Sequence, residues 1–277
     1  MNTTESTSTS PSTFSPNALR AIWQGIKLTW DKLGLILAFS LTGSLAVMLV
    51  LACWILFGKL HPAYGTVLGL GVALMVIPPL FAGACHVAHL VLVPDELSYA
   101  DFWRGLSKYY WLSVQLGVIQ AIVCIILGVN ISFYLIWKSP FAVIALVASL
   151  YALILWLMMI LYQYPVLIAQ EAGLFDDPDH KAKRGAFAVL RRSLFLTLGS
   201  PLYSFLVLLG AILLTALAVV TAVLFVSLWG GLLCFVLTVT LREVLMKYGI
   251  VPIPLPITAI PDEGFHIPRP ERDLGKG

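Results

Sequence analysis

Residues 33–57 read LGLILAFSLTGSLAVMLVLACWILF and contain no charged side chain. About 20 consecutive apolar residues are enough for a helix to cross the hydrocarbon core of a bilayer. The stretch therefore predicts a transmembrane helix. Because it begins only at Leu33 and exceeds the apolar core of a secretory signal, we interpret it as an uncleaved first span.

Further apolar runs follow along the chain. Three of them, at about 66–93, 112–137 and 141–169, are each long enough for one span. The last run, 201–245, fits two spans joined by a tight turn near Ser227 to Gly231. If there is no turn, the run is one span and the chain has five spans in total. Of the 277 residues, 60% are hydrophobic and only 11% are charged, whereas soluble proteins have about 25% charged residues. We predict an all-α integral membrane protein with six transmembrane helices arranged as three hairpins.

The basic residues favour six spans with both termini in the cytoplasm. In that arrangement every Lys and Arg faces the cytoplasm except Lys59 and Lys138, as the positive-inside rule requires for short loops. A five-span chain would place Arg242 and Lys247 outside, next to the membrane, which weakens that alternative. The formal charge of +3 is too small to indicate binding of nucleic acid.

A short amphipathic segment precedes the first span. Residues 19–30, LRAIWQGIKLTW, place apolar side chains on one helical face and polar ones on the other. The pattern predicts a cytoplasmic helix in the membrane interface, with aromatic rings at the depth of the headgroups. The motif Ile22-Trp23-Gln24-Gly25-Ile26 returns as Phe102-Trp103-Arg104-Gly105-Leu106, and Phe187 stands for the tryptophan in a weaker third copy.

The three copies predict an internal repeat. Each unit would be an interfacial helix followed by a transmembrane hairpin, and all three units would have the same orientation, as in parallel repeats. Convergence is the alternative, because any interfacial helix needs aromatic and basic residues. The expected interfacial anchors are Trp23, Trp30, Trp103, Tyr110 and Phe187.

Two tails flank the membrane domain, which we place at residues 17–250. Residues 1–16 are rich in Ser and Thr and are expected to be disordered. Residues 251–277 begin with closely spaced prolines that exclude a helix, so we expect an extended, Pro-rich cytoplasmic tail. The tail would serve as a linker or as a docking peptide for a partner.

The most reactive side chains in the apolar runs belong to Cys85, His86 and His89. On a helix, Cys85 and His89 lie at i and i+4 and could share a metal ion, with Glu171 or His180 as a third ligand. In the alternative, which we favour, the two histidines lie near the end of the span with their tips among the headgroups. We therefore assign no metal site and expect no cofactor.

Prolines and neutral polar residues interrupt the apolar runs. Pro78 and Pro79 should kink the second span, and kinked helices build sites in transporters but also occur for packing alone. The candidates for a substrate path are Gln120, Asn130, Gln163, Pro78 and Pro79, and hydrogen bonding between helices is the alternative role of the polar ones. No charged residue lies near mid-span, which argues against an ion-driven transporter.

Three short motifs occur in a fixed order. PPLFAGACHVA at 78–88 ends the second span, Asp101-Phe102-Trp103 opens the next amphipathic segment, and Tyr164-Pro165 closes the fourth span. This order resembles the YesL-type family of uncharacterised bacterial inner-membrane proteins over about residues 20–245. The resemblance implies a bacterial cytoplasmic (inner) membrane protein with a helper role in carbohydrate uptake. His86 and His89 depart from the family pattern.

No catalytic signature accompanies these features, because the sequence lacks a GxSxG elbow, a phosphate-binding loop and a dinucleotide fingerprint. The first functional hypothesis is a non-enzymatic, multi-pass accessory or assembly factor for a membrane complex. Its partners would be the lipid bilayer and another membrane protein. The alternatives are a small-solute facilitator and a metal-dependent membrane enzyme.

Overall fold

The computed structural model describes residues 16–59, 61–91, 98–137, 139–175, 184–221 and 229–251. Within these ranges every regular element is a helix. The helices are α1 (Ala18–Asp31), α2 (Leu33–Gly58), α3 (Pro62–Val91), α4 (Tyr99–Ile136), α5 (Pro140–Glu171), α6 (Ala186–Gly199), α7 (Pro201–Thr221) and α9 (Trp229–Lys247). Six of them (α2, α3, α4, α5, α7 and α9) are long and apolar enough to cross a membrane. The predicted fold class, an all-α protein with six membrane-spanning helices, is confirmed. The two tails, 1–15 and 252–277, lie outside the described residues.

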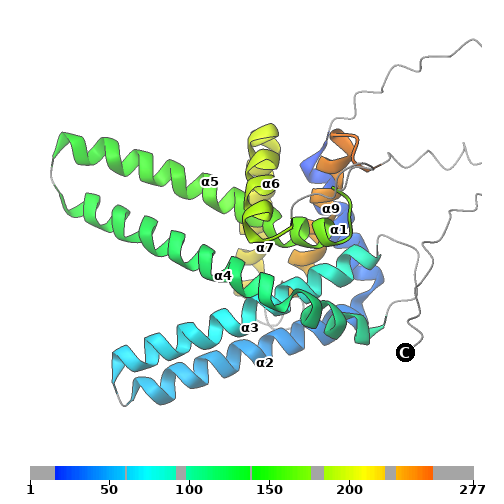
Figure 1. The fold of residues 1–277 in the computed structure, drawn as a ribbon, viewed down its shortest axis with the longest axis horizontal. Helices are drawn as coiled ribbons and strands as arrows, with labels where there is room; N and C mark the ends of the chain where they lie inside the picture. Colours follow the sequence, from blue (N-terminus) through cyan, green and yellow to red (C-terminus); the bar gives the residue numbers. More distant parts are fainter. Residues whose placement is uncertain are drawn as a thin grey trace, which may run out of the picture.

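Two long hairpins, α2–α3 and α4–α5, extend in the same direction and diverge toward their tips (Figure 1). The sequence explains where the second helix of each hairpin begins, since α3 starts at Pro62 and α5 at Pro140. Proline suits the first turn because the backbone N–H there has no partner within the helix. The remaining two spans, α7 and α9, flank residues 222–228, which are not described.

The predicted turn near Ser227 to Gly231 is wrong at its C-terminal side, because α9 already begins at Trp229. Gly231 is a packing residue instead. Its backbone N–H donates a hydrogen bond to Ser40 Oγ at 3.2 Å, and a Cβ atom on Gly231 would lie 2.5 Å from Ile36 Cγ2. The glycine therefore allows α9 to approach α2 closely. Ser227 lies outside the described residues.

Helix α9 forms the centre of the molecule. In its spanning window 72% of the residues are buried, compared with 17% in α2 and 11% in α5. It packs against α1, α2, α3, α5 and α7, and the C-terminal parts of α3 and α5 join it in one buried cluster. We call this region the closed end; it comprises α1, α6, the first turns of α4 and the last turns of α3, α5 and α9.

The three amphipathic segments all lie at the closed end. Each packs on the second helix of a different pair of consecutive spans. Helix α1 packs on α9, the start of α4 packs on α3, and α6 packs on α5. Lys32 and Ser200 end α1 and α6 as separate helices. The second segment, in contrast, forms the first turns of α4, capped by Ser98 and Asp101. It continues into its span without a break, so α4 is one helix from Tyr99 to Ile136.

The five expected anchors of the amphipathic segments are exposed, whereas Phe102 and Tyr109 of the second segment are buried. The exposed fractions are 68% for Trp23, 73% for Trp30, 48% for Trp103, 39% for Tyr110 and 81% for Phe187. In α1 small residues make the helix contacts, because Ala21 and Gly25 are buried. A Cβ atom on Gly25 would lie only 2.7 Å from Val236 Cα of α9. This orientation suits interfacial anchors, and the anchoring itself stays a prediction.

Candidate functional site at the closed end

Two of the predicted substrate-path residues meet in one hydrogen-bonded group between α4 and α5. Gln120 Nε2 donates to Gln163 Oε1 at 2.5 Å, and the Tyr164 hydroxyl donates to Gln120 Oε1 at 3.3 Å. The Gln163 side chain is fully buried, and its Nε2 has no partner among the described residues. The amide pair therefore joins two spans, which is the interhelical role that the sequence left open.

The other path candidates are placed apart from this group. Asn130 lies ten residues beyond Gln120 on α4, which corresponds to about 15 Å along a helix. Pro78 and Pro79 are buried inside α3. A Cβ atom on Gly117 of α4 would lie 2.5 Å from Pro78 Cγ, so Pro78 fills a close α3–α4 contact. The five candidates do not converge on one cavity.

The Cys85, His86 and His89 cluster is divided between two sides of α3. Cys85 and His89 line a cavity together. The His86 ring faces α4 instead, with its centroid 5.4 Å from that of Tyr109. Among the described residues there is no group of three His, Cys, Asp or Glu side chains that could hold a metal ion.

Neither proposed third ligand completes that cluster in the described structure. The Glu171 carboxylate lies 3.8 Å from the Arg184 guanidinium, so it takes part in an ion pair. His180 lies outside the described residues. The metal hypothesis therefore rests on Cys85 and His89 alone.

The cavity next to Cys85 and His89 has a volume of about 170 Å³ and lies between α3, α5 and α9. Its polar lining consists of Cys85, His89, Thr238 and Arg242, and the remaining lining side chains are apolar. Cys85 is fully buried, whereas His89 and Arg242 are partly exposed. The cavity thus has a cationic, accessible side and an apolar, buried side.

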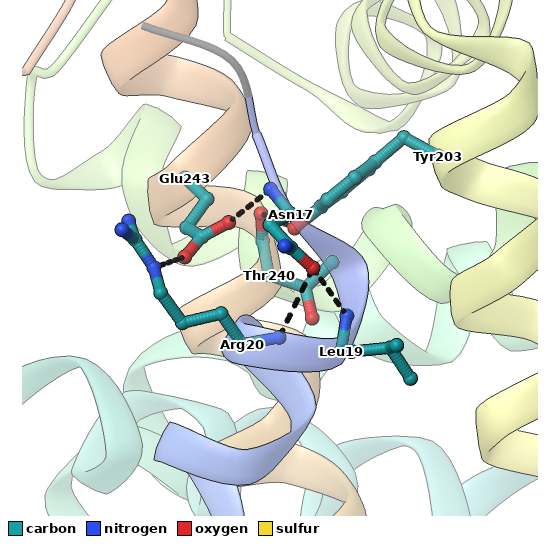
Figure 2. A network of polar contacts seen from close by, with 6 residues as sticks. All are labelled: Asn17, Leu19, Arg20, Tyr203, Thr240 and Glu243. Atoms are coloured by element: carbon teal, nitrogen blue, oxygen red, sulfur yellow. Dashed lines mark hydrogen bonds and ion pairs between the residues drawn. The ribbon is translucent and has the colours of Figure 1, made fainter.

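A buried carboxylate, Glu243, fastens the start of α1 to α9 (Figure 2). Its Oε2 accepts a hydrogen bond from the Asn17 backbone N–H at 3.1 Å, and its Oε1 accepts one from Arg20 Nε at 3.1 Å. The Glu243 side chain is 1% exposed, whereas the Arg20 side chain is 51% exposed. We call this arrangement the Glu243 clamp.

The sequence also explains why α1 begins next to Glu243. Asn17 Oδ1 accepts hydrogen bonds from the Leu19 and Arg20 backbone N–H groups at 3.1 and 3.3 Å, as an N-cap residue does. A carboxylate beside the first turn is further favoured by the helix dipole. One turn earlier on α9, the Thr240 carbonyl accepts a hydrogen bond from the Tyr203 hydroxyl at 3.3 Å, which joins α7 to α9.

Two more polar contacts join helices at the closed end. Lys247 Nζ of α9 donates to the Gly199 carbonyl at 3.2 Å and to Ser200 Oγ at 2.6 Å, so it caps the C-terminus of α6. Arg192 of α6 donates to Gln170 Oε1 of α5 at 2.6 Å. These polar side chains therefore hold helices together, and a cavity beside Arg242 has room for a ligand.

Comparison of the chain with protein-family models, with curated proteins and with solved structures finds no match. The function is therefore argued from the geometry of the fold and of the closed end.

Proposed function

We propose that the chain is a non-enzymatic accessory or assembly factor of a membrane complex, related to the YesL-type family and working with another membrane protein, in carbohydrate uptake or a similar process. The observation that carries the proposal is the exposure of the outer halves of the first two hairpins. These hairpins diverge toward their tips (Figure 1), and only 11% to 33% of the residues in their spanning windows are buried. Large apolar side chains of all four helices are exposed there.

An apolar stripe on α4 is the strongest candidate for the contact with that partner. Ile122, Ile126, Val129 and Phe133 are all exposed, and their spacing places them on one face of the helix. Apolar anchors at such a spacing are the features by which one helix recognises another protein. A solute path, in contrast, needs helices on all sides of it, and the diverging hairpins do not supply them.

The charge distribution supports an orientation with the closed end in the cytoplasm of a bacterial inner membrane, with both termini inside. Basic side chains gather at the closed end, whereas Lys59 lies at a hairpin tip. Those at the closed end are Arg20, Lys27, Lys32, Arg104, Lys108, Arg184, Arg191, Arg192, Arg242 and Lys247. The positive-inside rule then sets the direction of insertion.

Cysteine labelling tests this orientation. In a chain without its native cysteines, a membrane-impermeant maleimide should react with Lys27→Cys only after the cells are opened. It should react with His61→Cys in intact cells, because His61 lies at a hairpin tip. The reverse pattern would overturn the orientation.

Affinity purification from native membranes in mild detergent, read by mass spectrometry, tests the accessory role. The wild-type chain should retain a membrane protein in near-stoichiometric amount. The double variant Val129→Ala/Phe133→Ala should lose most of it. The matched variant Phe205→Ala/Leu209→Ala, which shortens exposed apolar side chains on α7, should keep it. A wild-type chain that is reproducibly free of partners would contradict the proposal.

A small-solute facilitator is the second candidate, because Gln120 and Gln163 do come together between α4 and α5. Purified protein in liposomes distinguishes the two functions. The accessory role predicts no uptake of small neutral solutes above that of empty liposomes. Uptake that is abolished by Gln163→Leu in a stable protein would favour the facilitator.

A further inference from the structure

The cavity between α3, α5 and α9 combines two chemical characters. Arg242 and His89 line its accessible side, and the apolar side chains of Ile168, Leu241 and Leu245 line much of the rest. No acidic side chain is among the described residues that line it. Such a combination suits a ligand with one negatively charged group and a compact apolar body.

Arg242 is available to such a ligand. Arg20, Arg104 and Arg184 each lie within 4 Å of a carboxylate, whereas Arg242 has no ion pair within the part of the chain that the structure describes. A guanidinium presents two parallel N–H groups that match the two oxygens of a carboxylate.

The polar side chains that line the cavity offer few hydrogen-bond donors to a bound anion. The Thr238 hydroxyl already donates to the Cys234 carbonyl at 2.8 Å. Because the thiol of Cys85 is only a weak donor, the strong donors left for an anion are the guanidinium of Arg242 and the imidazole of His89. This set fits a monoanionic carboxylate better than a phosphate, which has more oxygens and more charge to satisfy.

The volume of the cavity limits the size of the apolar part of the ligand. Its volume is about 170 Å³, and an apolar cavity of about 150 Å³ in another protein accommodates benzene. A ring of that size, or the first few methylenes of an acyl chain next to its carboxylate, would fill the space between Ile168 and Leu245.

From these observations we infer that the cavity binds a monocarboxylate with a compact apolar body, with the carboxylate on Arg242 and the apolar part against α5 and α9. The ligand comes either from the aqueous phase as a small acid or from the bilayer as a fatty acid. This ligand site is separate from the partner contact on α4, so either proposal can fail without the other.

Calorimetric titration of the purified full-length chain in a neutral detergent tests the inference with three probes. Benzoate should bind, whereas benzyl alcohol, which has the same ring without the charge, should bind at least about tenfold more weakly. Hexadecanoate represents the fatty acid. Tighter binding of hexadecanoate than of benzoate assigns the bilayer as the source, and the reverse order assigns the aqueous phase.

Three variants decide whether the binding occurs in this cavity. Arg242→Gln should weaken the binding of the acids by about tenfold or more. Ala169→Leu, which fills the cavity from α5 without changing its charge, should abolish binding while the protein stays folded. Lys27→Gln removes an exposed charge elsewhere and should leave binding unchanged.

The inference is overturned if neither acid binds the wild-type chain. It is also overturned if benzyl alcohol binds as tightly as benzoate, or if Ala169→Leu keeps full binding. Because Ala169→Leu leaves Arg242 in place, its result does not depend on whether Arg242→Gln folds.

Discussion

The two halves of α3 have nearly the same hydropathy and opposite surroundings. In the outer half, large side chains such as Tyr64, Val67 and Met75 are exposed. In the inner half, small residues such as Ala82, Cys85 and Ala88 are buried. Hydropathy alone therefore places a residue in the membrane. The size of its side chain, and of the side chains opposite, decides whether it faces lipid or another helix.

Close approach occurs at the closed end and also at the tip of the first hairpin, where a Cβ atom on Gly65 would lie 2.6 Å from Gly58 Cα. A Cβ atom on Gly105 would lie 2.6 Å from the His86 ring, and one on Gly83 would lie 3.1 Å from the Phe102 ring. Glycines such as Gly43 and Gly128, in contrast, have open space beside them. Glycines with such close neighbours are therefore expected to be sensitive to substitution, and glycines in open space tolerant.

The Glu243 clamp should give the largest effect on stability. Arg20→Ala leaves the buried Glu243 carboxylate without its cation, so the free energy of unfolding should fall by about 3 kcal/mol. Unfolding in mixed detergent micelles measures the loss. Adding Glu243→Gln should restore part of the stability, because the glutamine carries no charge. A double variant at least as unstable as Arg20→Ala alone would contradict the clamp.

The contact of α1 with α9 should give the next largest effect. Gly25→Ala places a methyl group against the Val236 backbone, and the overpacking should lower the free energy of unfolding by about 1–3 kcal/mol. The matched change Gly43→Ala lies in open space and should be neutral or stabilising by up to about 1 kcal/mol. Equal effects of the two variants would show that α1 does not pack as described.

The amide pair between α4 and α5 should contribute less. Gln163→Leu removes the hydrogen bond to Gln120, which should lower the free energy of unfolding by about 1 kcal/mol. Asn130→Leu is the control on the same helix pair and should change stability little. A Gln163→Leu protein of full stability would show that the amide pair does not join the spans.

The outward aromatic residues should give the smallest effect on the folded protein. Trp23→Ala removes a side chain that contacts little protein, so thermal unfolding in detergent should change by only a few tenths of a kcal/mol. The loss should appear instead as weaker association of α1 with lipid, measured by fluorescence quenching with brominated lipids. A stability loss as large as that of Gly25→Ala would place Trp23 inside the protein.

The spans could be predicted from the sequence because crossing a bilayer demands long apolar helices, a signal local to each stretch. The position of the turn between the last two spans could not be predicted from the sequence. Gly230 and Gly231 resemble turn residues in the sequence, and only the partner helix shows that Gly231 is needed for packing. The continuity of α4 was missed as well, since the amphipathic segment and the span at about 112–137 were predicted as two separate helices.

The polar contacts were only partly predictable. Gln120 and Gln163 were found because a neutral amide in an apolar run must seek a partner. Glu243 was missed, because it follows Arg242 near the end of a span and resembles an ordinary surface charge there. Its partners, Asn17 and Arg20, lie more than 220 residues away in the sequence. The cavity has no local signal at all, since its walls come from three helices.

The most direct test of the accessory role is photo-crosslinking in native membranes. A photoreactive residue at Val129 or Phe133, on the apolar stripe of α4, should crosslink to one discrete membrane protein. The same residue at Leu209, exposed on α7, should react only with lipid. Lipid adducts alone at all three positions would contradict the claim that the diverging hairpins are the surface for a partner.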